Sequence, residues 1–336
     1  MKKIAINGLG RIGRLILRHF LTTPPAHIEV VACNDLTPAE DIAYLMKYDS
    51  VHGQFPLPIN VAGDGIVYDQ KKIEYYNIKD PAELPWKESG VDIVLECTGF
   101  FSKRAGASKH LEAGASHVVI SAPSKDADMT CVLGVNDHKF EPASHSIISN
   151  ASCTTNALAP VLKVLHENFI IDNAMATTIH AYTATQALVD RYSKKRRRGR
   201  AAALSLIPTS TGAAKAITKV LPELENKVAA IAVRAPVPDC ALLDITAQLQ
   251  TDVTVKDVNN SFIRAAESSM KDIMEVSQEE LVSVDVIGNT HSAVIDAMST
   301  DVLNRKVVKV MAWYDNEIAY AKRMLDLAAY IASKTD

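Results

Sequence analysis

Short apolar runs, each followed by a polar turn or a helical pattern, mark the first half of the chain. After the first run, the apolar residues Ile12, Leu15, Ile16 and Phe20 recur at helical spacing, and a further helical stretch covers residues 105–113. Strands that alternate with helices predict a parallel sheet built from βαβ units. The strand candidates of this half lie at residues 3–7, 28–33, 91–96, 117–120 and 146–148.

The second half has a different pattern. A helical pattern runs from Leu158 to Phe169, and apolar and polar residues then alternate within most of the later strand candidates. Such alternation is typical of a mixed or antiparallel sheet with one face covered. A polar stretch interrupts it at residues 181–200, and an amphipathic helix is predicted over 316–333. The strand candidates of this half lie at residues 175–179, 228–233, 242–249, 281–286, 293–297 and 307–313.

Three glycines, Gly8, Gly10 and Gly13, stand between the first apolar run and the first helix. In this setting a G-x-G-x-x-G turn is the fingerprint of a dinucleotide site: its glycines permit a tight turn, close approach of backbone to a pyrophosphate, and close packing of helix on strand. Asp35 follows the second strand, where a carboxylate that binds the adenosine ribose is expected. The alternative is a glycine turn with a helix-capping aspartate. Further polar turns, at the strand ends where such sheets bind ligands, are residues 98–99 and 121–123.

Cys153 lies where a strand is followed by a helix. Unpaired backbone N–H groups and the positive end of the helix dipole gather at a helix start and favour the thiolate, which is the nucleophilic form of cysteine. The alternative is a small buried cysteine inside an ordinary helix cap. The hydroxyl neighbours Ser152 and Thr154 favour the reactive thiol.

Composition excludes several classes of protein. The chain is 48% hydrophobic and 22% charged, and its net charge of −3 indicates neither a nucleic-acid-binding nor a membrane-surface protein. No apolar stretch approaches the length of a membrane span. The five cysteines suggest neither a disulfide framework nor close metal-ligand spacing, so we expect a cytoplasmic protein without a metal. They are Cys33, Cys97, Cys131, Cys153 and Cys240.

These patterns predict an α/β fold class, with a Rossmann-type parallel-sheet domain plus an α+β catalytic domain that holds a mixed or antiparallel sheet. A chain of 336 residues is long for a single core, so two domains are the natural expectation. We expect the first domain over residues 1–151, completed by the C-terminal helix 316–336, and the second over residues 152–315.

With these residues in view, the chain resembles the glyceraldehyde-3-phosphate dehydrogenase family over essentially its whole length. The most specific block is Ala-Ser-Cys-Thr-Thr-Asn at residues 151–156, which that family shares with the erythrose-4-phosphate dehydrogenases. Residues 34–37 and 209–215 resemble the glyceraldehyde enzymes rather than the erythrose enzymes. The other motifs that carry the resemblance lie at residues 6–14, 47–50, 149–150, 208 and 313–317.

The resemblance implies a reaction centred on Cys153 and His180. The Cys153 thiolate would attack the aldehyde of glyceraldehyde 3-phosphate, while His180 would hold the thiolate as an ion pair and accept the hydroxyl proton. Hydride transfer to NAD would leave a thioester, which inorganic phosphate would convert to 1,3-bisphosphoglycerate. Without the resemblance, His180 would be interpreted as a structural histidine at a strand end.

The resemblance also implies two anion sites and a cofactor site, made of the hydroxyls, backbone amides and guanidinium groups that bind phosphate. The substrate's phosphate would lie on Thr183, Lys194 and Arg234. The attacking phosphate would lie on Ser152, Thr154, Arg198, Thr211 and Gly212. NAD would contact Asn7, Gly8, Gly10, Arg11, Ile12, Gly13, Asp35, Thr98, Ser121, Tyr320 and, at its nicotinamide carboxamide, Asn316.

A basic run at residues 194–200 has two interpretations. It resembles a nuclear-localisation or nucleic-acid patch, but in the family this loop lies between subunits and lines the neighbour's cofactor site. We therefore expect a homotetramer and no nucleic-acid partner. In the same loop, Arg191 would lie near the neighbour's adenosine ribose, where it would oppose the preference for NAD over NADP that Asp35 favours.

The chain departs from the family at four places, namely Leu9, Ala157, Arg191-Tyr192 and Ile318-Ala319. Ala157 replaces a second cysteine, which should spare catalysis, and Ile318-Ala319 replaces Trp-Gly near the nicotinamide. Three competing functions are an erythrose-4-phosphate dehydrogenase, an inactive NAD-binding interaction protein and a Cys–His hydrolase. The intact pair of Cys153 and His180 opposes the second, and the dinucleotide fingerprint opposes the third.

Overall fold

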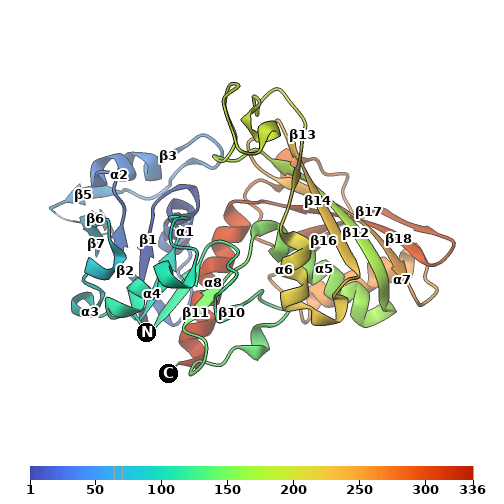
Figure 1. The fold of residues 1–336 in the computed structure, drawn as a ribbon, viewed down its shortest axis with the longest axis horizontal. Coiled ribbons are helices and arrows are strands. Elements are labelled where there is room, and N and C mark those ends of the chain that lie inside the picture. The colour runs from blue at the N-terminus through green and yellow to red at the C-terminus, as the bar shows by residue number, and fades with distance from the viewer. Residues whose placement is uncertain (64, 70, 336) are drawn as a thin grey trace. The chain divides into compact units, whose positions relative to one another are not determined.

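The structure is a computed structural model that describes residues 1–63, 65–69 and 71–335, and the chain divides into two units. Unit 1 comprises Met1–Cys131, His138–Ser152 and Tyr320–Asp336, and unit 2 comprises Val132–Asp137 and Cys153–Ala319. Figure 1 traces the chain from the blue N-terminus to the red C-terminal helix.

Within the described residues, unit 1 is built on a nine-stranded sheet whose strands run parallel from β10 across to β7. The parallel strands predicted from the apolar runs all form, and their central members are fully buried. An antiparallel edge made by β5, β6 and β7 was not predicted. In spatial order the strands are β10 (Met129–Thr130), β11 (Ile147–Ser149), β9 (His117–Ile120), β8 (Ile93–Glu96), β1 (Lys2–Asn7), β2 (Ile28–Asn34), β7 (Lys71–Tyr76), β6 (Gly65–Tyr68) and β5 (Asn60–Ala62).

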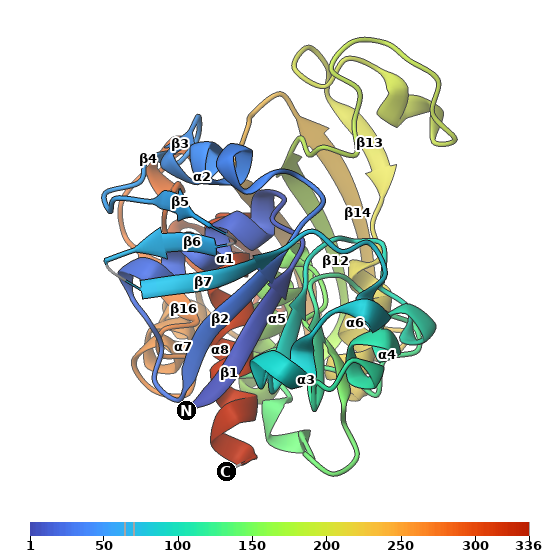
Figure 2. The same ribbon diagram turned by 90° about the vertical axis from the view of Figure 1, so that its left-hand side faces the viewer.

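Helices of unit 1 bury the faces that the sequence periodicity predicted. In α1, Leu15, Ile16 and Phe20 are buried, and this helix packs on β1 while α4 packs on β9. Figure 2 shows β1, β2, β7 and β6 side by side. The helices are α1 (Arg11–Thr22), α2 (Ala39–Lys47), α3 (Trp86–Ser89), α4 (Arg104–Glu112) and α8 (Ile318–Lys334), with the short η1 (Pro81–Glu83), η2 (Asp137–Lys139) and the hairpin β3 (Tyr48–Asp49) and β4 (Gly53–Gln54).

Unit 2 contains a seven-stranded mixed sheet among its described residues. Helix α5 packs on β12 and β15, α6 on β14, and α7 on β16 and β17, so strand residues alternate between buried and exposed as predicted. The strands in spatial order are β13 (Ile207–Ser210), β14 (Val228–Ala235), β12 (Ile171–Ala181), β15 (Ala241–Leu249), β18 (Val307–Tyr314), β17 (Ala293–Leu303) and β16 (Met274–Ser277). The helices are α5 (Cys153–Phe169), α6 (Ala213–Val220), α7 (Val255–Glu267), η3 (Arg196–Gly199), η4 (Pro222–Leu224) and η5 (Ser283–Val286).

One predicted strand is wrong. Residues 281–286 alternate like a strand, but Ser283–Val286 form the short helix η5. The side chain of Asp285 accepts a hydrogen bond from the backbone N–H of Val282 at 2.8 Å, which closes a local turn in place of a strand pairing. Val282 and Val284 are exposed, and Val286 is buried in a small cluster with Val294. The strand that extends this edge is β16 instead.

Candidate active site

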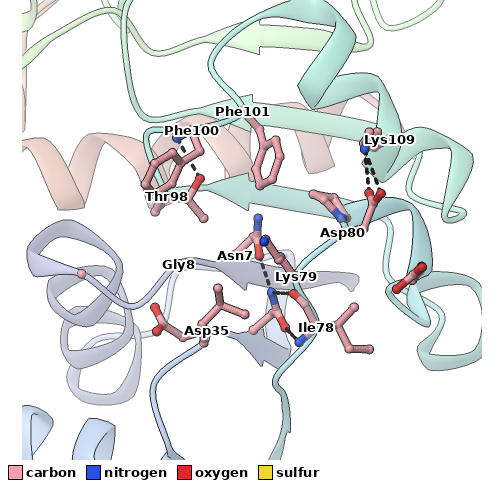
Figure 3. Close-up of a pocket in the computed structure, with 16 residues that line it drawn as sticks. Asn7, Gly8, Asp35, Ile78, Lys79, Asp80, Thr98, Phe100, Phe101 and Lys109 are labelled. Atoms are coloured by element: carbon pink, nitrogen blue, oxygen red, sulfur yellow. Dashed lines mark hydrogen bonds and ion pairs between the residues drawn. The ribbon is translucent and has the colours of Figure 1, made fainter.

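Unit 1 holds a cavity of about 830 Å³ at the carboxyl ends of β1, β2 and β8. Such an edge is where parallel α/β sheets bind ligands. Asn7, Gly8, Gly10, Asp35 and Thr98 line it, as Figure 3 shows for the residues that it labels. The remaining residues expected to bind the cofactor, Arg11, Ile12, Gly13, Ser121, Asn316 and Tyr320, do not line this cavity within the described part of the chain.

Each of the three glycines of the turn is required for a different geometric reason. Gly8 has a φ of +94°, and a Cβ there would lie 2.7 Å from the backbone nitrogen of Thr98. A Cβ on Gly13 would lie 1.9 Å from the carbonyl oxygen of Gly8, so the third glycine is required for packing of the helix. A Cβ on Gly10 would meet nothing within 4 Å. The open space at Gly10 fits the backbone approach that a pyrophosphate requires.

The carboxylate of Asp35 is held in place at the end of β2. One oxygen accepts the backbone N–H of Leu9 at 2.6 Å, and the other accepts the N–H of Thr37 at 2.9 Å. A carboxylate fixed beside this cavity is a suitable acceptor for ribose hydroxyls. The cavity, the glycine turn and Asp35 together fit NAD, which supplies a hydride acceptor when bound.

Arg11 opens helix α1 and pairs with a carboxylate. Its guanidinium donates to Asp49 at 2.5 Å. Burial raises the pKa of the Asp49 carboxyl, but the backbone N–H groups of His52 and Val51 and the Arg11 guanidinium outweigh it and lower that pKa to about 2. Arg11 is thus a member of an ion pair in this structure.

Tyr320, Ser121 and Asn316 lie in different surroundings. Tyr320 is buried and its hydroxyl donates to the carbonyl of Ala151 at 3.1 Å, and Ser121 follows strand β9 directly. Asn316, also buried, belongs to unit 2 and precedes helix α8. Its neighbour Asp315 accepts the backbone N–H groups of residues 317 and 318 at 2.8 Å each, which caps the start of that helix.

The candidate nucleophile and base meet in unit 2. Cys153 is the first residue of α5, and His180 lies on β12, where it is buried. The Sγ atom of Cys153 lies 3.5 Å from Nε2 of His180. On the other side of the ring, Nδ1 lies 2.8 Å from the carbonyl of Ala181 and 2.8 Å from a guanidinium nitrogen of Arg234. The structure therefore joins a thiol, an imidazole and a cation that the sequence separates by 27 and 54 residues.

Burial and the Arg234 charge have opposite effects on the pKa of Cys153 but act in the same direction on the pKa of His180. Burial raises the pKa of the Cys153 thiol above its usual value, and the Arg234 guanidinium and the hydrogen bonds at the start of α5 offset only part of that rise. Burial, and then the Arg234 cation, lower the pKa of His180 to about 3. The imidazole is therefore neutral at pH 7 in the unliganded site and able to accept a proton.

A buried hydroxyl group that sequence reasoning missed supports this pair. The Tyr314 hydroxyl lies 2.9 Å from that of Thr154 and 2.7 Å from that of Thr178. The Tyr314 ring packs edge-on against His180, with the ring centroids 5.9 Å apart. Tyr314 belongs to the motif at residues 313–317, which carries the family resemblance, and no spacing rule predicts from the sequence that it faces His180.

Comparison with known proteins shows the family of this chain. A glyceraldehyde 3-phosphate dehydrogenase NAD binding domain matches residues 2–104, and the C-terminal domain of the same family matches residues 152–316. The chain belongs to the glyceraldehyde-3-phosphate dehydrogenase family. It is 53% identical to the glyceraldehyde-3-phosphate dehydrogenases of Geobacillus stearothermophilus and Priestia megaterium, and 52% identical to glyceraldehyde-3-phosphate dehydrogenase 1 of Bacillus subtilis. Each match covers 332 residues, which is 99% of this chain and 98% of the relative.

Family membership confirms several expectations from sequence. The chain is an NAD-dependent glyceraldehyde-3-phosphate dehydrogenase of glycolysis, and its fold class is α/β with a parallel cofactor-binding sheet and a mixed second sheet. Within the described part of the chain, no helix has both the length and the apolar character that crossing a membrane requires.

The residues expected to bind the two phosphates occupy unit 2, except Ser152, which lies in unit 1. Arg234 lies against His180, and Lys194 is exposed. The Thr183 hydroxyl lies 2.9 Å from that of Thr185. Arg198 donates to the Thr209 hydroxyl at 3.0 Å. Thr209 lies near the end of β13, and Thr211 and Gly212 follow that strand and lead into α6. Thr154 is buried and its hydroxyl contacts Tyr314.

Proposed function

We propose that this glyceraldehyde-3-phosphate dehydrogenase is the phosphorylating kind, which forms 1,3-bisphosphoglycerate through a hemithioacetal and a thioester on Cys153. The observation that carries the proposal is the approach of Cys153 Sγ to His180 Nε2 at 3.5 Å. A thioester needs a nucleophile that also leaves readily when phosphate attacks, and a thiolate meets both needs.

The proton movements follow from the surroundings of His180. His180 Nδ1 lies between the Ala181 carbonyl, which only accepts, and an Arg234 guanidinium nitrogen, which only donates, so each neutral tautomer has a partner there. In the tautomer whose Nδ1–H donates to the Ala181 carbonyl, Nε2 is unprotonated and faces the thiol. Cys153 sulfur then adds to the aldehyde carbon, and His180 accepts a proton at Nε2. NAD, held at the glycine turn and Asp35, would supply the acceptor for the hydride that this carbon loses as the thioester forms. A phosphate oxygen then adds to the thioester carbon, the carbon–sulfur bond breaks, and Cys153 leaves as thiolate.

Arg234 links substrate binding to the base. After burial, its guanidinium is the largest cause of the lowered pKa of His180. A substrate phosphate on Arg234, Thr183 and Lys194 would offset that positive charge, which raises the pKa of His180 and favours proton acceptance. The attacking phosphate would take the separate set Ser152, Thr154, Arg198, Thr211 and Gly212.

A homotetramer is the assembly that we propose. On the sheet of unit 2, Met175, Ile179 and Ile231 are 70%, 37% and 57% exposed, on the face turned away from α5. In the loop that carries the basic run, Leu188 and Tyr192 are 81% and 89% exposed. Apolar surface of this extent is typical of an interface, and further copies of the chain would cover it. Sedimentation analysis tests this, and a monomer at working concentration would contradict it.

We further propose a cytoplasmic location, for which the five free cysteines are the support. We also propose a preference for NAD over NADP, because the carboxylate of Asp35 would repel the additional phosphate of NADP.

The deciding experiment measures NADH formation from glyceraldehyde 3-phosphate with and without inorganic phosphate, and compares erythrose 4-phosphate as substrate. We expect sustained turnover only with phosphate, and a higher kcat/KM for glyceraldehyde 3-phosphate. Sustained turnover without phosphate would exclude the phosphorylating mechanism, and a higher kcat/KM for erythrose 4-phosphate would favour the erythrose enzyme instead.

A further inference from the structure

A buried carboxylate lies directly behind the cofactor cavity and takes no part in the mechanism above. Glu96 ends strand β8 and is 1% exposed. One of its oxygens accepts the Asn7 amide at 2.6 Å and lies 3.1 Å from Nε2 of His110. The other accepts the backbone N–H of Thr98 at 2.8 Å and the hydroxyl of the same residue. Asn7 and Thr98 also line the cavity, so Glu96 holds two cavity-lining residues in place without lining the cavity itself.

The orientation of the Asn7 amide is fixed from one end of this network. The backbone N–H of Ile78 donates to the Asn34 carbonyl oxygen at 2.9 Å, and the Ile78 carbonyl accepts the Asn34 amide at 3.0 Å. Asn34 has therefore only one orientation that satisfies both groups. Its amide also donates to the Asn7 carbonyl oxygen at 2.7 Å, so Asn7 must turn its own NH₂ toward Glu96. Figure 3 shows this chain from Ile78 to Asn7.

The tautomer of His110 is fixed from the other end. The indole N–H of Trp86 can only donate, and it lies 3.0 Å from Nδ1 of His110. Nδ1 therefore accepts, the single ring proton of a neutral His110 is on Nε2, and it is donated to Glu96. Both oxygens of Glu96 thus face donors, which is the arrangement that an ionised carboxylate requires. His110 is 0% exposed and sits on helix α4.

We propose that Glu96 and His110 are positioning residues for NAD. The Glu96 carboxylate holds Asn7 and Thr98 in fixed positions in the cavity wall. His110, whose tautomer is fixed by Trp86, donates its Nε2–H to that carboxylate. The inference rests on the proposed use of this cavity by NAD. Since the Thr98 hydroxyl donates to Glu96 and accepts the N–H of Phe100 at 3.0 Å, its hydrogen-bonding capacity is largely used inside the protein. Thr98 therefore shapes the cavity through its fixed position.

Two substitutions at His110 separate hydrogen bonding from packing. His110 stacks on Trp86 at a centroid distance of 6.2 Å and meets Phe101 edge-on at 6.5 Å. His110→Phe keeps this aromatic packing but removes both the acceptor and the donor. His110→Gln loses the ring but keeps one acceptor and one donor. If His110 positions Glu96, the Phe variant should raise the Kd of NAD roughly 10-fold and the Gln variant less than about 3-fold.

Glu96→Gln tests the carboxylate itself. In either orientation, its new NH₂ faces donors, namely Asn7 and His110 on one side or Thr98 on the other. We expect the Kd and the KM for NAD to rise roughly 10-fold or more, with kcat at saturating NAD within about 2-fold of the wild type. The reacting groups belong to unit 2, which is why kcat should hold. Glu112→Gln is the matched control, because Glu112 is exposed on α4, the helix that carries His110, and this substitution should change neither the Kd nor the KM for NAD.

A spectroscopic measurement shows whether the network itself responds. The chain has two tryptophans, so a sample labelled with ¹⁵N-tryptophan gives two indole resonances, and Trp313→Phe identifies that of Trp86. His110→Phe should move the Trp86 resonance and Glu112→Gln should not. The proposal is overturned if His110→Phe binds NAD as the wild type does, or more tightly than His110→Gln, because packing would then decide. If wild-type protein binds no NAD, the proposed function fails instead.

Discussion

Gly10 and Gly13 belong to one fingerprint but should fail in different ways when each is replaced by alanine. The Cβ of alanine at position 13 would lie 1.9 Å from the carbonyl oxygen of Gly8, while ordinary contact begins at 3.4 Å. Backbone must therefore move by 3.4 − 1.9 = 1.5 Å to relieve the overlap. The same methyl group at position 10 meets nothing within 4 Å in the protein.

The expected magnitudes follow from these distances. Overpacking typically costs about 1–3 kcal/mol, and a rigid backbone obstacle belongs at the upper end, so the overlap in Gly13→Ala should cost about 3 kcal/mol. The better helix propensity of alanine offsets about 1 kcal/mol of this at most. The free energy of unfolding of Gly13→Ala should therefore be lower by about 2–3 kcal/mol. Gly10→Ala loses only a modest N-cap preference, below about 1 kcal/mol. Its methyl group instead occupies the space that a pyrophosphate needs, so the Kd of NAD should rise roughly 10-fold or more.

Urea unfolding and calorimetric titration with NAD measure the two effects on each variant. Gly13→Ala should lose stability, and Gly10→Ala should keep stability and lose NAD affinity. The reasoning is refuted if Gly13→Ala is as stable as the wild type, or if Gly10→Ala binds NAD with unchanged affinity while remaining folded.

Three further predictions concern the nucleophile, the choice of cofactor and acid stability. Cys153→Ser should abolish NADH formation while NAD binding persists, and an alkylating reagent should modify Cys153 faster than the other four thiols; equal labelling would contradict this. Wild-type protein should have a higher kcat/KM with NAD than with NADP, with Asp35→Gly raising NADP use and Arg191→Leu lowering it; the reverse preference would show that the carboxylate is outweighed. The pKa of Asp49 is lowered to about 2 in the folded state, so its stabilising contribution is present above its unfolded pKa and is lost as the pH falls toward 2. Urea unfolding of wild type and Asp49→Asn should therefore differ at pH 6 and converge near pH 2. A constant difference would exclude the ionised carboxylate, with its bonds to His52, Val51 and Arg11, as the source.

Most of the fold of unit 1 could be predicted from local sequence patterns. A strand, a glycine turn and a helix are adjacent in sequence, so the cofactor turn at Gly8 and the nearby Asp35 could be predicted from spacing alone. The antiparallel edge at β5 and β6 could not, because these strands are only three and four residues long, too short for a periodicity to show. The alternation at residues 281–286 predicted a strand, but the local hydrogen bond to Asp285 decides for a turn.

The site was predictable only where one residue has a distinctive neighbourhood. Cys153 stands out through its helix start and hydroxyl neighbours. Tyr314 and His110 do not, since their roles come from contacts across the fold, with His180 and with Trp86. Glu96 carried one usable signal, an acidic residue at the end of an otherwise apolar strand. Its partners Asn7 and His110 come from β1 and α4, and only the fold brings them to the end of β8.

The thioester on Cys153 is the central claim, and mass spectrometry of the acid-quenched enzyme tests it most directly. Protein mixed with glyceraldehyde 3-phosphate and NAD in the absence of phosphate should form NADH in an amount equal to that of active sites. The peptide that contains Cys153 should then carry a phosphoglyceroyl group, and adding phosphate should remove it. An unmodified Cys153 after NADH has formed, or a group that phosphate does not release, would contradict the mechanism.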